Sequence, residues 1–180
     1  ITLGANDSVF FPASKQMIEE VKRKYGIKKK YILSVCTIEP RKNIGALIKA
    51  FSILNPDDCM LVLTGKTGWI SRTFFQEIET CRIKDKLIFT GYVPDEDLAP
   101  LYSGAEIFVY PSIYEGFGLP VLEAMKSGCP VITSIFSALP EVIGNAGIAV
   151  ETTDIGLLAK TIKSLLRNDK MRKSLRRMGL

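Results

Sequence analysis

Short apolar runs alternate along the chain with longer segments in which apolar residues recur at helical spacing. The short runs are apolar throughout, which is typical of parallel strands that are covered on both faces of a sheet. They lie at Tyr31–Val35, Met60–Thr64, Leu87–Thr90, Ile107–Tyr110, Val131–Thr133 and Ile148–Val150. The pattern therefore predicts a parallel sheet of about six strands.

Amphipathic helices are predicted between these strands. Ser14 and Asn43 are N-capping residue types, and each precedes apolar residues in helical register. Gly26 is the expected stop of the helix that Ser14 opens. The other predicted helices are Phe74–Cys81, Asp95–Ser103, Leu119–Ser127 and a long final helix lined by Ile155, Leu158, Ile162 and Leu165. This alternation predicts a single α/β domain with a doubly wound sheet over residues 1–180.

Ligands of such sheets bind beyond the carboxyl ends of the strands, so the loops after the strands are the places to look for function. After the first strand, Pro40 precedes Arg41 and Lys42, which stand just before the helix that begins at Asn43. Two cations and the free N–H groups of a helix start make an anion site suited to a pyrophosphate. The alternative is an exposed basic pair beside a helix cap.

The loop after the second strand reads Gly65-Lys66-Thr67-Gly68-Trp69. Glycines allow the backbone to approach a ligand closely, but G-x-x-G is also common in ordinary tight turns. The segment is not a P-loop, because its lysine and threonine follow the first glycine directly. Gly65 and Lys66 are candidate donor-binding residues only together with the neighbouring loops.

The loop after the fourth strand carries two carboxylates beside a sharp turn. Gly116 and Gly118 bracket a strand-to-helix turn, with Glu115 in the loop and Glu123 about one turn into the helix. Both glutamates are expected to point toward one cleft, where a carboxylate can accept two hydrogen bonds from a ribose diol. The alternative is that both are favourable charges near a helix N-terminus.

Composition and charge narrow the classes of function. The chain is 47% hydrophobic and 24% charged, which is an ordinary globular balance, and its net charge is +5. The basic excess lies largely in residues 22–30 and 163–177, without aromatic interleaving or a nucleic-acid motif, so no nucleic-acid partner is expected. We expect first that these basic residues lie on solvent-exposed faces of helices. A basic rim facing an anionic membrane or a phosphorylated acceptor is the alternative.

The metal-ligating residue types are sparse. The chain has no histidine and no C-x-x-C pair, so no metal site is expected. Its four cysteines, at positions 36, 59, 81 and 129, are expected to be buried thiols in a reducing cytosol. Asp95-Glu96-Asp97 is a D-x-D sequence, but it follows Pro94 and opens a helix, which favours a capping and helix-dipole role.

These motifs together resemble glycosyltransferase family 4. Glu115 and Glu123 form its E-x7-E pattern, and EGFGLPVLEAM with SGCPVITS is similar to its donor loop. The segments SVCTIEPRKN, LVLTGKTGW, LIFTGYVPDEDL and LPEVIGNAGIAV follow in the order and spacing of that family. The resemblance covers nearly the whole chain. It implies the Rossmann-like C-terminal, nucleotide-sugar-binding half of a GT-B glycosyltransferase.

The resemblance also implies residue roles. Arg41 and Lys42 would contact the donor diphosphate and stabilise the leaving group without a metal or other cofactor, and Glu123 would hold the ribose hydroxyls. Glu115, a catalytic candidate with the two cations, would hold the donor sugar together with the backbone of Gly116, Phe117, Gly118 and Leu119. The base pocket would be lined, largely through backbone, by Gly91, Tyr92 and Val93. Cys36 stands where many relatives have glycine, and we expect it to narrow the cleft or shift the loop.

The implied reaction is retaining transfer of a hexose to a glycan or lipid-linked acceptor, in the cytoplasm or peripherally at the cytoplasmic membrane face. An acceptor-binding domain is expected before residue 1, so the isolated chain should bind donor but transfer sugar poorly. GDP-mannose is the first expectation for the donor, because the GKTGW and EPRKN segments look closest to mannosyltransferases. UDP-glucose, UDP-galactose and an N-acetylhexosamine donor stay open. The alternatives are a nucleotide-sugar epimerase of similar architecture and a non-catalytic nucleotide-sugar-binding module.

Overall fold

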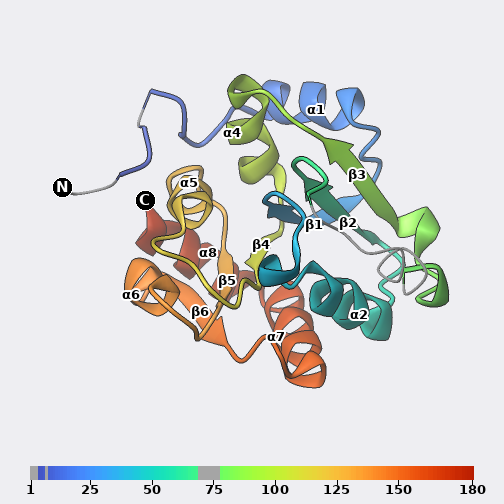
Figure 1. The fold of residues 1–180 in the computed structure, drawn as a ribbon. Helices are drawn as coiled ribbons and strands as arrows, with labels where there is room; N and C mark the ends of the chain where they lie inside the picture. The colour runs from blue at the N-terminus through green and yellow to red at the C-terminus, as the bar shows by residue number, and fades with distance from the viewer. Residues whose placement is uncertain (1–3, 7, 69–77) are drawn as a thin grey trace.

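The computed structural model describes residues 4–6, 8–68 and 78–180. Its core is a sheet of six parallel strands in the order β3-β2-β1-β4-β5-β6 (Figure 1). The strands are β1 Lys30–Val35, β2 Cys59–Thr64, β3 Leu87–Gly91, β4 Ile107–Tyr110, β5 Val131–Ser134 and β6 Gly147–Val150. Each predicted strand is confirmed to within one residue at either end. The strand order reverses between β1 and β4, so the loops after these two strands flank the crevice of the sheet.

Helices cover both faces of this sheet. They are α1 Lys15–Lys24, α2 Ile44–Leu54, α4 Asp95–Gly104, α5 Leu119–Lys126, α6 Leu139–Ile143, α7 Ile155–Arg167 and α8 Asp169–Gly179, with 3-10 turns η1 Pro40–Lys42 and η2 Lys84–Lys86. The short α6 was not predicted. Of the predicted helix over 74–81, residues 78–80 are helical, and residues 74–77 lie outside the described part of the chain.

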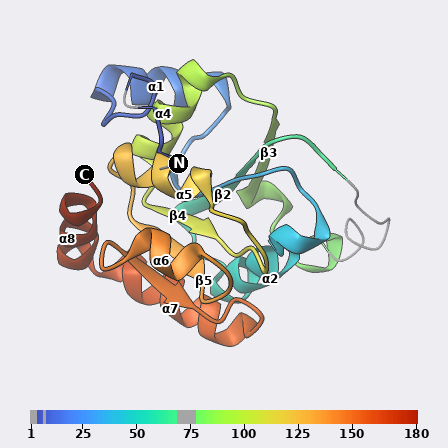
Figure 2. The ribbon, with the colours of Figure 1, turned by 60° about the vertical axis from the view of Figure 1, so that its left-hand side comes forward.

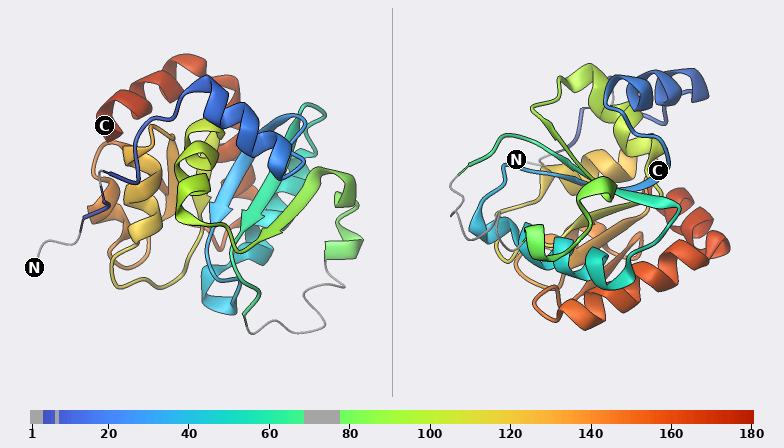
Figure 3. Two further views of the ribbon diagram at one scale, coloured as in Figure 1. Left: turned by 90° about the horizontal axis from the view of Figure 1, so that it is seen from above. Right: turned by 90° about the vertical axis from the view of Figure 1, so that its right-hand side faces the viewer.

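Two apolar clusters sandwich the sheet. One joins it to α1, α4, α5 and α6 through side chains such as Val21, Tyr102 and Leu139. The other joins it to α2, α7 and α8 through side chains such as Phe51 and Leu158. Figures 2 and 3 show these two helical layers on opposite sides of the strands. This arrangement explains why the strands are apolar throughout, because both faces of each strand pack against apolar side chains of helices.

The two predicted helix caps have different outcomes. Ser14 accepts a hydrogen bond from the backbone N–H of Met17 (3.3 Å), which confirms its N-cap role. Asn43 does not cap α2 through its side chain. It closes the η1 turn in a left-handed conformation, with a φ of 53°, and its side-chain amide donates to the carbonyl of Thr152 (3.1 Å). The helix does begin directly after Asn43, but the predicted side-chain cap is absent, because a capping residue normally has an extended backbone and that of Asn43 is left-handed.

The predicted final helix, lined by Ile155, Leu158, Ile162 and Leu165, is confirmed as α7, and α8, which was not predicted, follows it. Asn168 separates them and caps α8 by accepting from the backbone N–H of Met171 (2.9 Å). The buried guanidinium of Arg172 donates to the carbonyls of Leu165 and Leu166 at the end of α7 and pairs with Glu106 (3.2 Å). These contacts satisfy the terminal carbonyls of α7, which have no helical partner.

In the described ranges, no helix is long and apolar enough to cross a membrane.

Candidate functional site

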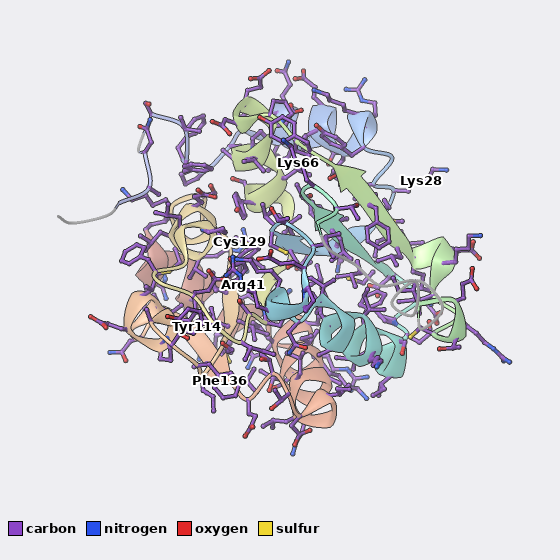
Figure 4. All side chains as sticks on the ribbon, in the orientation of Figure 1. Lys28, Arg41, Lys66, Tyr114, Cys129 and Phe136 are labelled. Atoms are coloured by element: carbon purple, nitrogen blue, oxygen red, sulfur yellow. The ribbon has the colours of Figure 1, made fainter. Side chains whose placement is uncertain are left out.

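The loops after β1 and β4 meet at the carboxyl edge of the sheet, where Arg41 and Tyr114 lie on neighbouring segments in Figure 4. The carbonyl of Arg41 accepts a hydrogen bond from the backbone N–H of Ile113 (2.8 Å), and the Ser112 hydroxyl oxygen lies 3.1 Å from the same carbonyl oxygen. The Arg41 guanidinium donates in return to the carbonyl of Tyr114 (3.1 Å). Ser134, at the end of β5, donates to the carbonyl of Ser112 (2.5 Å). The protein's own hydrogen bonds thus hold the two loops together.

The Glu115 carboxylate is the centre of this junction. Its Oε1 accepts hydrogen bonds from the Lys42 ammonium, the Ser112 hydroxyl (2.7 Å) and the Tyr110 hydroxyl (3.0 Å). Its Oε2 pairs with Nη1 of Arg41 at 3.2 Å. The structure therefore brings the three predicted catalytic residues into one ion-pair cluster, although the sequence assigned them to separate parts of the donor.

The two cations differ in their freedom to move. The Lys42 side chain is only 8% exposed and also donates to the Tyr110 hydroxyl (2.8 Å), so it is fixed by the cluster. The Arg41 side chain is 48% exposed and is shared between Glu115 and Glu39, whose Oε1 lies 2.6 Å from Nε. Lys42 is therefore a fixed charge, whereas Arg41 is half-exposed and is held by its pairs with Glu39 and Glu115 and by its hydrogen bond to the Tyr114 carbonyl.

The protonation states of the cluster follow from these contacts. Burial raises the pKa of Glu115, but hydrogen bonds from Lys42 and Ser112 and the Lys42 charge oppose it, and the net result is a lowered pKa. Burial, reinforced by the Glu115 charge, raises the pKa of Tyr110 well above its ordinary value. At neutral pH the cluster therefore holds an ionised carboxylate beside a neutral phenol.

Glu123 lies in α5 and has its own partners. Its Oε2 accepts a hydrogen bond from the hydroxyl of Tyr102 in α4 (3.0 Å). Burial raises its pKa, the Tyr102 hydrogen bond lowers it, and the charge of nearby Asp95 raises it further. The two glutamates of the E-x7-E pattern are therefore in opposite electrostatic settings, one surrounded by cations and one beside a second carboxylate.

The loop after β2 packs against the loop after β1. Gly65 has a φ of +132°, and a Cβ on it would lie 2.0 Å from the carbonyl oxygen of Cys36. The backbone N–H of Ile38 donates to the carbonyl of Lys66 (2.9 Å), and that of Gly68 donates to the carbonyl of Ile38 (3.0 Å). The approach that requires glycine at Gly65 is therefore made by this protein's own backbone. Trp69, the last residue of the motif, lies outside the described residues.

The proposed base-binding segment follows β3 at the same edge. Tyr92 is 65% exposed, and the Lys66 ammonium lies 5.4 Å from the centre of its ring. Gly91 is exposed and accepts a hydrogen bond from the backbone N–H of Gly65 (2.8 Å). The Val93 side chain is buried in the core, so this residue can offer a ligand only its backbone.

The turn before α5 is fixed by one glycine rather than two. Gly118 has a φ of +97°, and a Cβ on it would lie 2.5 Å from Cδ2 of Leu139. Gly116 is exposed, and a Cβ on it would meet no atom within 4 Å. Phe117 is half-buried and Leu119 is exposed at the start of α5. The space beside Gly116 is open, as an approach of a ligand to the backbone would require.

Cys36 is half-buried at the end of β1, and burial raises the pKa of its thiol to about 12, with Lys42 opposing the shift. Its backbone N–H donates to the carbonyl of Thr64 (2.9 Å). Cys59 and Cys129 are buried, but Cys36 and Cys81 are only half-buried, so the prediction of four buried thiols was wrong for these two. Cys36 directly follows β1, and Cys81 directly follows the helical residues 78–80.

Asp95, Glu96 and Asp97 form the first turn of α4, as predicted from the D-x-D sequence. The N-cap itself is Pro94, without a side-chain hydrogen bond, so the capping part of that prediction was wrong. The Asp97 carboxylate instead accepts from the Lys24 ammonium (2.5 Å) and the Tyr25 hydroxyl (2.7 Å) of α1. In the described part of the chain, no three histidine, cysteine or acidic side chains are grouped as metal ligands would be.

Sequence reasoning missed the hydroxyl groups that position the two glutamates: Tyr102, Tyr110 and Ser112. Tyr110 ends a strand, and Ser112 precedes Glu115 by three residues. Their hydroxyls are buried or partly buried and face carboxylates. A polar-tipped side chain at the carboxyl end of an otherwise apolar strand was the signal that could have identified Tyr110.

Comparison with known proteins gives one consistent result. The model of the family "Glycosyl transferases group 1" matches residues 17–179. The chain is 40% identical, over 98% of its length, to the O-antigen chain mannosyltransferase B of Escherichia coli, and it spans 47% of that protein.

Two solved structures share the fold. The sucrose-phosphate synthase of Thermosynechococcus elongatus superposes with a TM-score of 0.85 at 28% identity, over 99% of this chain and 46% of that one. The C-terminal domain of a group 1 glycosyl transferase family protein from Francisella tularensis superposes with a TM-score of 0.82 at 29% identity, over 98% of this chain and 94% of that domain. The chain thus spans about half the length of the mannosyltransferase and of the synthase, and nearly all of an isolated C-terminal domain.

Proposed function

The chain belongs to the group 1 glycosyltransferases, and from this premise we propose that it is the donor-binding half of a retaining hexosyltransferase. The reaction is transfer of a hexose, with mannose as the first candidate, from a nucleotide-diphosphate sugar to a glycan or lipid-linked acceptor. The 40% identity to a curated mannosyltransferase supports the choice of mannose. The acceptor would be bound by another part of the full-length protein, and a peripheral membrane contact would bring a lipid-linked acceptor within reach.

The convergence of Arg41, Lys42 and Glu115 at the carboxyl edge of the sheet carries this proposal. A departing nucleoside diphosphate develops negative charge, and preorganised cations stabilise that charge most effectively because they need no reorganisation during the reaction. Each charge-assisted hydrogen bond contributes about 1.5–3 kcal/mol. Two such cations can take the place that a metal ion holds in other transferases, so we propose metal-independent transfer.

Without donor, the cations are already neutralised. Arg41 and Lys42 face two carboxylates, Glu39 and Glu115, so the formal charge of this group is zero. An incoming diphosphate must therefore exchange partners with at least one cation. Arg41 is the one that can exchange at lower cost, because its side chain is 48% exposed and its pair with Glu39 lies at the surface, where ion pairs contribute little.

The remaining parts of the donor have candidate partners along the same edge. Glu123 has one oxygen occupied by Tyr102, which leaves its other oxygen for the ribose hydroxyls. The exposed Gly116 backbone is placed for the sugar, next to Glu115. Tyr92 and Lys66 form an exposed platform at the end of β2 and β3, which suits a nucleobase.

Calorimetric titration of the full-length protein tests this proposal. GDP-mannose, GDP, UDP-glucose and UDP are titrated separately, each with magnesium and again with a chelator. We expect selective binding of one nucleotide family, unchanged by chelation and weakened about 10-fold or more by Glu123→Ala, the loss of a charge-assisted hydrogen bond.

The matched control is Glu19→Ala, which removes an exposed carboxylate on α1. It should leave nucleotide affinity unchanged. Failure of the full-length protein to bind any of the four ligands would contradict the proposal, and binding that is lost on chelation would contradict its metal-independent part.

A further inference from the structure

The hydroxyl of Tyr110 lies between the two charged groups of the site. Tyr110 is the last residue of β4 and is buried, with its oxygen 2.8 Å from the Lys42 ammonium and 3.0 Å from Oε1 of Glu115. An ammonium can only donate, so the Tyr110 oxygen accepts from Lys42, and its own proton is directed to Glu115. One hydroxyl therefore fixes a cation and an anion at the same time.

The Tyr110 ring cannot easily move. It stacks on Phe108, with ring centres 5.9 Å apart and planes at 21°, and the Lys42 ammonium lies 5.1 Å from its centre. Burial and the adjacent carboxylate raise the pKa of Tyr110 well above its ordinary value, so the phenol keeps its proton throughout the physiological range. The hydroxyl is a permanent donor on a ring that the core holds in place.

The hydrogen bonds to Glu115 are unevenly distributed. Oε1 accepts from Lys42, Tyr110 and Ser112, whereas Oε2 has the half-exposed Arg41 as its partner. A carboxylate oxygen offers about two lone-pair sites, so Oε1 has no capacity left for a ligand. Oε2, with Arg41 as its one partner among the described residues, keeps an acceptor site.

We propose that Tyr110 is a positioning residue for sugar transfer: its hydroxyl fixes Lys42 and Glu115 as one unit, so that Oε2 of Glu115 is the oxygen presented to the donor. This inference rests on the proposed function. Fixing the unit matters because a charge that stabilises a transition state is effective only when it is already in place. Tyr110 acts through its two partners and is not itself expected to touch the donor.

Tyr110→Phe is the direct test, because it removes the hydroxyl and keeps the ring. The matched control is Tyr31→Phe, since Tyr31 is also fully buried at the sheet and its hydroxyl donates to the carbonyl of Leu101 (2.7 Å), away from the charged cluster. Ser112→Ala is less suitable, because the Ser112 hydroxyl also contacts the carbonyls of Arg41 and Tyr114.

The steady-state rate of sugar transfer is measured over a range of pH for the full-length wild type, Tyr110→Phe and Tyr31→Phe. We expect Tyr110→Phe to lower kcat about 10-fold, with the donor KM changed less than threefold, because the lost interaction serves the transition state. The acid limb of its rate profile should also move to higher pH, since Glu115 loses a hydrogen bond that favours its ionised form. Tyr31→Phe should change neither the kcat nor the pH profile.

Three results separate this inference from the proposed function. Absence of transfer by the wild-type enzyme with every nucleotide sugar would overturn both. An active wild type whose folded Tyr110→Phe variant matches Tyr31→Phe in kcat and in the acid limb would overturn the positioning role alone. An equal loss of kcat in the two variants would also overturn it, because it would reflect general loosening of the sheet.

Discussion

Lys42 and Glu115 form a buried ion pair that joins the loop after β1 to the loop after β4. The two residues are 73 positions apart in the chain, and their side chains are 8% and 10% exposed. Neither charge could be buried alone without a large desolvation cost, so each explains the presence of the other. The pair is at once a tether between loops and the centre of the proposed donor site.

Removing one partner of this pair should cost more stability than removing an exposed ion pair. We expect Lys42→Ala to lower the free energy of unfolding by about 2–4 kcal/mol, because it leaves Glu115 buried with a weaker set of donors. Lys22→Ala, which breaks the exposed Lys22–Glu19 pair, should cost less than about 1 kcal/mol. Urea unfolding of the two variants measures the difference, and equal costs would mean that the buried pair is not a structural tether.

Gly65 should be among the least replaceable glycines. Gly65→Ala would place a Cβ 2.0 Å from the Cys36 carbonyl at a φ of +132°, so the two loops would have to separate. We expect a loss of about 2–4 kcal/mol from this clash and the strained backbone. Gly26→Ala is the control, because Gly26 has a φ of +69° but open space around it, and it should cost about 1 kcal/mol. Thermal or urea unfolding would contradict the packing argument if the two losses were the same.

Glu115 and Glu123 should contribute to stability with opposite dependence on pH. The lowered pKa of Glu115 means that its contribution is present above the unfolded pKa and is lost as the pH falls through the folded value. The raised pKa of Glu123 means that its contribution is present below the unfolded pKa and is lost as the pH rises through the folded value.

Unfolding free energies of Glu115→Gln and Glu123→Gln, measured between acid and neutral pH, test these signs. Relative to wild type, Glu115→Gln should be increasingly destabilised as the pH rises from the acid range to neutrality. Glu123→Gln should show the reverse trend, becoming relatively more stable at neutral pH. The same direction of change in both variants would contradict the assigned environments.

The sequence was sufficient for the sheet and for the meeting of the two loops. A strand that is apolar on both faces is stable only when helices cover both faces of its sheet. In a parallel sheet, the loops that carry Arg41 and Glu115 both leave from the carboxyl edge. The partners of Glu115 were not predictable. The spacing of Glu115 and Glu123 along the chain does not say which way the Glu115 side chain points, and Lys42 is 73 residues away from it. Likewise, Asn43 has the chemistry of a cap, but its left-handed backbone leaves the cap hydrogen bond unmade, and its amide N–H donates to Thr152, a contact that no local pattern encodes.

The final helix shows a related limit. Leu158, Ile162 and Leu165 of α7 were predicted from their periodicity, but α8, whose Leu175 faces the same apolar cluster, was not predicted. The break is made by Asn168, which caps α8, and by Arg172, which satisfies the carbonyls at the end of α7. Both are polar interactions at a helix end, and apolar periodicity carries no information about them.

Replacing Arg41 should weaken donor binding while changing the stability of the fold little. The Arg41 side chain is 48% exposed, its pair with Glu39 is at the surface, and Glu115 keeps Lys42 as a partner without it, so Arg41→Ala should lower the free energy of unfolding by less than about 1 kcal/mol. If the guanidinium moves from Glu115 to the donor diphosphate, the same variant should weaken nucleotide-diphosphate binding about 10-fold or more, the loss of a charge-assisted contact. Calorimetry on the full-length protein measures this, with Lys24→Ala, which breaks the Lys24–Asp97 pair, as the control of unchanged affinity. Tighter binding in Arg41→Ala would show that Arg41 mainly blocks Oε2 of Glu115, and the exchange of partners would then not drive donor recognition.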